Sequence, residues 1–121
     1  VGSLFNELLF AYNNLGKHEF MLASHLYSEL NKLNKITVIG TDFSSLKRTP
    51  TVSFVHNEFT ANQICQKLAQ ENICAWDGHF YALKAIQSLG LEEKGGVTRL
   101  GISAYNSLDE VNRTVEAISK I

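Results

Sequence analysis

Two segments in the last third of the chain decide the fold: Cys74-Ala-Trp-Asp-Gly-His-Phe-Tyr81 and Thr98-Arg-Leu-Gly-Ile-Ser-Ala-Tyr-Asn-Ser107. The second segment predicts an apolar strand over 97–102 that carries one arginine, Arg99. Because an unpaired buried charge is costly, we expect this guanidinium to meet an anion. The planar fork of arginine suits a carboxylate, which can accept two parallel hydrogen bonds from it. The alternative is an internal salt bridge, for instance with Asp77.

Helices and short strands alternate around these segments. Strands are expected over 35–39, 51–55, 73–76 and 97–102, and apolar periodicity predicts helices over 4–15, 18–33 and 80–89. The first helix is expected to end near Gly16. Capping boxes predict two further helix starts, one at Thr60 with Gln63 and one at Ser107 with Glu110. This order predicts an α+β fold, a small and mostly antiparallel sheet of about four strands with helices packed on one face.

Length and charge exclude several classes of protein. A chain of 121 residues suits one hydrophobic core, and its formal charge of −1 gives no electrostatic footprint for nucleic acid or an anionic membrane. No apolar run approaches the ~20 residues that span a bilayer. Two cysteines do not make a disulfide framework, so a cytoplasmic, reducing location is expected. The start at Val1-Gly2-Ser3, without methionine, suggests a fragment of a longer protein.

Other titratable residues do not form a recognisable metal or nucleophile motif. His18 and His25 lack the spacing of a zinc-protease helix, so we expect them on the surface or half-buried. With two cysteines and scattered histidines the sequence has no zinc spacing, and no metal site is predicted. Cys65 and Cys74 are expected to pack in the core, because free cysteine behaves as a small buried hydrophobe.

Three motifs resemble one enzyme family. The segment 48–121 resembles the carboxy-terminal small domain of class V aminotransferases, the pyridoxal-phosphate group that includes the cysteine desulfurases, and 18–40 fits the helix and strand that lead into it. The matching motifs are Thr49-Pro-Thr-Val-Ser-Phe54, Ile73-Cys-Ala-Trp-Asp-Gly-His-Phe-Tyr-Ala82, and Thr98-Arg-Leu-Gly-Ile-Ser-Ala-Tyr-Asn-Ser107 followed by Leu-Asp-Glu-Val-Asn112.

The resemblance implies a role for each matched residue. Arg99 would bind the α-carboxylate of an amino-acid substrate, and His79 would face the substrate. Trp76, Asp77, Gly78 and Tyr81 would belong to an active-site loop. Tyr81 stands where true desulfurases of this type carry the nucleophilic cysteine. Since a phenol cannot take up sulfur as a persulfide, desulfurase activity is not expected to survive in its usual form.

The resemblance also implies that the chain is incomplete as an enzyme. The Schiff-base lysine and the groups that hold pyridoxal phosphate belong to the large domain of this family, and Lys84 lacks their context. No catalytic or cofactor-binding residue is therefore assigned, and the parent enzyme would hold the cofactor. We expect 1–34 to be a helical lead-in from the large domain and 35–121 to be the small domain. The expected partners are that large domain and a second subunit of a homodimer.

A second class of function remains open from the sequence. The chain would then be a free-standing α+β module that binds a small ligand or a partner, with Arg99 as its anion anchor. Against this, the amino-terminal helix and the cluster of Trp76, Phe80 and Tyr81 offer more apolar surface than so small a sheet can cover. A docking face on a larger neighbour would explain that excess.

Overall fold

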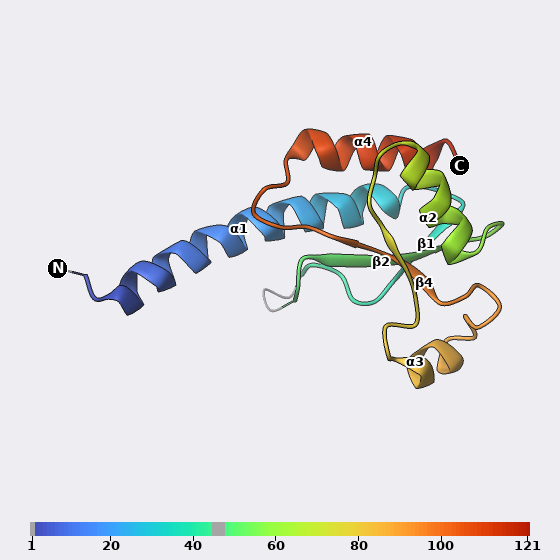
Figure 1. Cartoon of the computed structure of the whole chain (residues 1–121), viewed down its shortest axis with the longest axis horizontal. Coiled ribbons are helices and arrows are strands. Elements are labelled where there is room, and N and C mark those ends of the chain that lie inside the picture. Colours follow the sequence, from blue (N-terminus) through green and yellow to red (C-terminus); the bar gives the residue numbers. More distant parts are fainter. Residues whose placement is uncertain (1, 45–47) are drawn as a thin grey trace.

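A four-stranded antiparallel sheet forms the centre of the computed structural model, which describes residues 2–44 and 48–121 (Figure 1). Strands β1 (Ile36–Ile39), β2 (Thr51–His56), β3 (Trp76–Gly78) and β4 (Val97–Gly101) lie in the order β1-β2-β4-β3. Helices α1 (Leu4–Leu30), α2 (Ala61–Gln70) and α4 (Leu108–Ser119) pack on one face, while α3 (Leu83–Ser88) lies apart from them. The predicted α+β class and antiparallel sheet are confirmed.

The core lies between this helix layer and one face of the sheet. Along β2 the side chains alternate, so that Val52, Phe54 and His56 are buried while their neighbours are only partly covered. Fully burying an aliphatic or aromatic side chain is worth about 1.5–3 kcal/mol, which makes this layer the main source of stability. The helical residues that close the core are Leu22, Leu26, Leu30, Ile64, Leu68, Val111 and Ile118.

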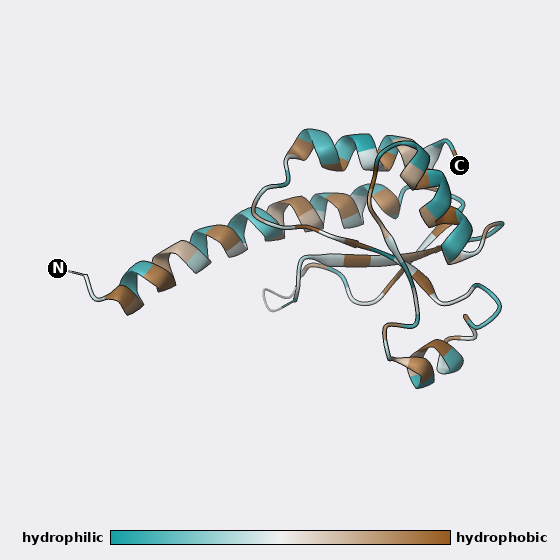
Figure 2. Cartoon of the chain, in the orientation of Figure 1, coloured by the Kyte–Doolittle hydropathy of each residue, from teal (hydrophilic) through white to brown (hydrophobic). Residues whose placement is uncertain are grey.

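Helix α1 is one continuous helix, and the predicted end near Gly16 is wrong. A Cβ at Gly16 would meet nothing within 4 Å, so the position is open and does not force a turn. A helical glycine costs only about 1 kcal/mol relative to alanine, which a helix of 27 residues can absorb. The first half of α1 projects away from the sheet, and Figure 2 shows apolar positions along this projection.

Both predicted capping boxes are present. Thr60 Oγ1 accepts from the backbone N–H of Gln63 at 3.3 Å, and Gln63 Oε1 accepts in return from Thr60 N at 2.9 Å. Ser107 and Glu110 repeat the arrangement at 3.2 and 3.0 Å. The backbone N–H of Ser107 is the main reason why the pKa of Glu110 lies below its usual range. These local bonds fix where α2 and α4 begin.

Two elements begin later than the sequence predicts. Asn72 takes a left-handed φ of 56° after α2, and Ile73 donates its backbone N–H to Leu68 O at 3.0 Å, so residues 73–75 pass over the core without pairing in the sheet. Strand β3 therefore starts at Trp76. The predicted helix over 80–89 begins only at 83, because Phe80 is left-handed, as is the residue after it. The segment between β1 and β2 includes residues 45–47, which lie outside the described residues.

Candidate functional site

The face of the sheet opposite the helices carries one row of side chains across all four strands. The register pairs Ile39 with Ser53, Ser53 with Arg99, and Arg99 with Trp76. Directly opposed residues in antiparallel strands point to the same face, with Cβ atoms roughly 5 Å apart. This row, called here the open-face row, places Arg99 on an inner strand with Trp76 beside it on the edge strand. Trp76 is 71% exposed.

Arg99 is exposed, so the sequence-based premise of a buried charge inside an apolar strand is wrong. Its neighbours Thr98 and Leu100 are buried, because β4 alternates between the core face and the open face. The guanidinium instead stacks on Phe80, with its Cζ 3.8 Å from the ring centroid. A cation over an aromatic face is attracted by the ring quadrupole.

The internal salt bridge with Asp77 does not form. Asp77 is paired with Thr98, which places it on the core face of the sheet, opposite to Arg99. Its carboxylate accepts a hydrogen bond from Asn62 Nδ2 at 3.4 Å. Within residues 2–44 and 48–121, the ion pairs are Lys32–Glu29, Lys35–Glu58 and Lys120–Glu116. In this part of the chain, Arg99 has no carboxylate partner.

A tight turn that begins at the last residue of β3 holds the remaining predicted loop residues. Gly78 has a φ of 128°, and Phe80 and Tyr81 are both left-handed, at 50° and 61°. His79 Nδ1 accepts the backbone N–H of Tyr81 at 3.1 Å, and the two rings lie edge to face with centroids 6.3 Å apart. His79 and Tyr81 are exposed on this turn, next to the aromatic ring that contacts Arg99.

A close backbone approach fixes this turn against β4. A Cβ built at Gly96 would lie 2.2 Å from the carbonyl oxygen of Gly78 and 2.4 Å from its carbonyl carbon. Gly96 also has a φ of 89°, a conformation that residues with a side chain rarely adopt. Only glycine therefore allows the strand after Gly96 to run so close to β3.

The two cysteines differ from each other. Cys65 is half-buried, and burial is the main reason why its pKa is raised to about 11, with the charge of Asp77 adding to the effect. A thiol with such a pKa is a poor nucleophile near neutral pH. Cys74 is exposed and precedes β3, so its predicted place in a strand and in the core is wrong. In the segment before β3, the side chain of Ile73 is buried in the core, and the side chain of Cys74 points to solvent.

Sequence reasoning missed three parts of this site. It treated Phe80 as surface apolar area, whereas the ring contacts Arg99. The sequence also does not reveal the close approach of Gly96 to Gly78 or the position of Ser53 beside Arg99. The period-2 geometry of a strand is the signal that could have put Arg99 on the open face, because it must point away from the side of its apolar neighbour Leu100.

The predicted histidines have structural partners. His18 Nε2 lies 2.9 Å from Asn106 O, and His25 Nε2 lies 2.8 Å from Asn112 Oδ1, so both connect α1 with the region around α4. Among the described residues, no three His, Cys, Asp or Glu side chains are grouped as a metal site would require. In the same part of the chain, no helix has both the length and the apolar content to cross a bilayer.

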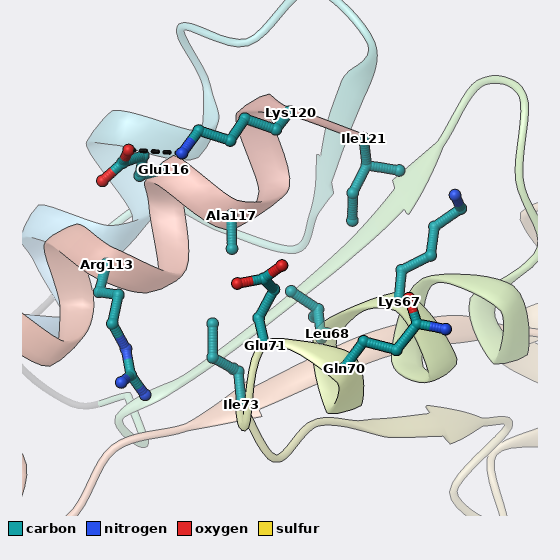
Figure 3. Close-up of a pocket in the computed structure, with 10 residues that line it drawn as sticks. All are labelled: Lys67, Leu68, Gln70, Glu71, Ile73, Arg113, Glu116, Ala117, Lys120 and Ile121. Carbon is teal, nitrogen blue, oxygen red and sulfur yellow. Dashed lines mark hydrogen bonds and ion pairs between the residues drawn. The ribbon is translucent and has the colours of Figure 1, made fainter.

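A hollow lies on the helix side, between α2 and α4 (Figure 3). Three of its charged side chains have partners within the protein: Lys120 Nζ lies 2.6 Å from Glu116 Oε1, and Arg113 donates to Asn72 O at 3.5 Å. Apolar side chains form the rest of the lining: Leu68, Ile73, Ala117 and Ile121. Because this hollow is separated from Arg99 by the sheet, it is not part of the candidate site.

The fold and the open-face row define a small α+β domain with an exposed arginine, Arg99, whose guanidinium stacks on the ring of Phe80. The family model for Aminotransferase class-V matches residues 6–114, so this chain belongs to the class V aminotransferase family. Cysteine desulfurase from Thermococcus onnurineus NA1 has the same fold over 89% of this chain and 26% of its own, with a TM-score of 0.79 and 24% identity. The cysteine desulfurase CsdA from Escherichia coli aligns over 84% of this chain and 24% of its own, with a TM-score of 0.72 and 20% identity.

Relatives found by sequence are also much longer than this chain. The "Aminotransferase-like protein FGM3" of Gibberella zeae is 28% identical over 114 residues, which are 91% of this chain and 28% of that protein. A "Probable cysteine desulfurase" of Pseudomonas putida is 29% identical over 103 residues, 85% of this chain and 24% of its own length. The chain thus spans about a quarter of the curated relatives that it matches.

Proposed function

We propose that this chain is the carboxy-terminal small domain of a longer class V enzyme, in which Arg99 binds the α-carboxylate of an amino-acid substrate. One observation carries the proposal: Arg99 lies on the open face without a carboxylate partner among the described residues, while a ring holds its guanidinium from one side. A guanidinium in this state can donate two parallel hydrogen bonds to an incoming carboxylate.

The loop around Arg99 supplies the walls of the proposed site. Trp76 lies beside Arg99 in the open-face row, and His79 and Tyr81 are exposed on the following turn. Asp77 and Gly78 shape this loop, the first through Asn62 and the second through its close contact with Gly96. Since Tyr81 carries a phenol where desulfurases of this type carry the thiol, we do not propose a persulfide on this loop. The proposed substrate class is an α-amino acid.

The cofactor would be held elsewhere in the longer protein. Members of this family use pyridoxal phosphate, which serves as an electron sink for carbanionic chemistry when it is bound. Lys84 is exposed on α3, and a residue on so open a surface does not fit a covalent cofactor site. The residues of this chain fit substrate binding better, so the Schiff-base lysine is expected in the large domain.

The projecting half of α1 supports a large-domain partner. Leu4, Phe5 and Phe10 are each 70% exposed there, and apolar patches of this kind mark contacts with another protein surface. We propose that 1–34 leads in from the large domain and that 35–121 forms the small domain, with the second half of α1 packed on its core. A homodimer and a cytoplasmic location are proposed with it; the unbridged Cys65 and Cys74 fit a reducing compartment.

Kinetics of Arg99 variants in the full-length protein test this function. Arg99→Gln is expected to lower kcat/KM for an amino acid by about 10- to 150-fold, because a hydrogen bond to a charged group is worth about 1.5–3 kcal/mol. Arg99→Lys keeps the charge but loses the two-pronged geometry, so it should fall between Arg99→Gln and the unaltered protein. Arg113→Gln, an exposed arginine on α4, is the matched control and should leave the parameters unchanged.

Unchanged kinetics in Arg99→Gln would contradict the assignment. A protein that turns over no amino acid but binds small anions, and loses that binding in Arg99→Gln, would favour the free-standing binding module instead.

A further inference from the structure

The ring of Phe80 lies against the guanidinium of Arg99, 3.8 Å from centroid to Cζ. We propose that Phe80 is a positioning residue that holds the Arg99 guanidinium in the plane that receives the substrate carboxylate. This inference rests on the proposed function of Arg99. Phe80 itself does not touch the substrate in this account, and it acts only through the arginine.

The backbone of the turn indicates that this contact is more than incidental. Phe80 and Tyr81 are both left-handed, an unusual conformation for residues with bulky side chains. The backbone N–H of Tyr81 donates a hydrogen bond to His79 Nδ1, and this bond stabilises the turn. Residues in such conformations persist where the surrounding structure holds them, and they cluster at binding and active sites.

Core packing does not explain why an aromatic residue occupies this position. Phe80 is only partly buried, and it does not belong to the apolar cluster between the sheet and the helices. Its contact with a charged group is the Arg99 guanidinium. The two residues come from different parts of the chain, and β3–β4 pairing together with the Gly78–Gly96 approach brings them together.

Stacking and carboxylate binding use different parts of a guanidinium. The ring attracts the flat face of the cation, whereas the N–H donors point outward in its plane and stay available. A stacked arginine also has fewer rotamers to lose when it binds, and this pre-organisation improves affinity. Leucine at position 80 would keep apolar bulk and lose the stacking, whereas tyrosine or tryptophan would keep it.

Substrate pairs that differ only in the carboxylate test the inference in the full-length holoenzyme. The pairs are L-cysteine with cysteamine and L-alanine with ethylamine. Phe80→Leu is expected to raise KM for the amino acids roughly two- to fivefold with kcat little changed, the size of an exposed cation–π contact. The amines should show no change, and Phe80→Tyr and Phe80→Trp should restore the KM of the unaltered protein. In an Arg99→Gln background, Phe80→Leu should have no further effect.

The matched control is Phe59→Leu, because Lys67 Nζ lies 4.5 Å from the Phe59 ring in a similar stack on the helix side. It should not change the ratio of amino acid to amine. If Arg99→Gln weakens amino-acid use and Phe80→Leu does not, the inference is overturned and the proposed function stands. If Phe80→Leu affects amines as strongly as amino acids, the ring supports the loop in general and the inference also fails. If neither variant has an effect, the proposed function fails and the inference fails with it.

Discussion

Replacing Gly96 by alanine tests whether the turn and the sheet are held together by a close backbone contact. The new Cβ would lie 2.2 Å from the carbonyl oxygen of Gly78, an atom of the backbone that cannot rotate away like a side-chain end. Over-packing of this kind costs about 1–3 kcal/mol. The φ of 89° adds about 1–2 kcal/mol for a residue with a Cβ. Gly96→Ala should therefore lower the free energy of unfolding by about 2–5 kcal/mol.

Gly95 provides a control one residue away. It has a φ of 70°, but a Cβ there would meet nothing within 4 Å. Gly95→Ala should therefore show the backbone cost alone, about 1–2 kcal/mol. Urea unfolding followed by circular dichroism gives both values under the same conditions. If the two variants lose the same stability, the close approach of Gly78 and Gly96 does not constrain the fold, and the explanation given for the turn is wrong.

Three further changes follow from local structure. Gly16→Ala should stabilise α1 by about 0.5–1 kcal/mol, since the position is open and helical; thermal unfolding measures the gain, and a loss would contradict a continuous helix. Ser107→Ala should cost about 1 kcal/mol, because α4 loses its cap, and the backbone amides of its first turn should exchange hydrogen faster. Unchanged exchange rates would show that the cap is dispensable. Burial lowers the pKa of His56 below 6.5, so the folded state binds fewer protons than the unfolded chain and stability should fall as the pH drops below about 6.5. Urea unfolding at several pH values measures how the free energy of unfolding depends on pH. His56→Gln should weaken this dependence, and an unchanged dependence would show that other groups cause it.

Sequence patterns predicted the helix starts correctly where the stabilising contacts are local. The capping boxes at Thr60 and Ser107 satisfy backbone donors within four residues, so sequence spacing is enough to find them. Gly16 misled the prediction because a single glycine weakens a helix but does not end it unless the chain must turn there.

Long-range register was the part that the sequence did not reveal. Residues 73–75 have strand-like composition, but Ile73 donates its backbone N–H to Leu68 O of α2, and pairing with β4 starts only at Trp76, opposite Arg99. The same register moved Arg99 from an expected buried position to the open face and separated it from Asp77. The stack of Arg99 on Phe80 depends on two residues with left-handed backbone conformations, which a periodic pattern of apolar residues does not predict.

The central claim is that Arg99 receives a substrate carboxylate, and a crystal structure of the full-length protein with L-alanine bound tests it most directly. The account predicts two hydrogen bonds of about 2.7–2.9 Å between the Arg99 guanidinium and the two carboxylate oxygens. A carboxylate bound by other residues, with Arg99 left facing solvent, would contradict it.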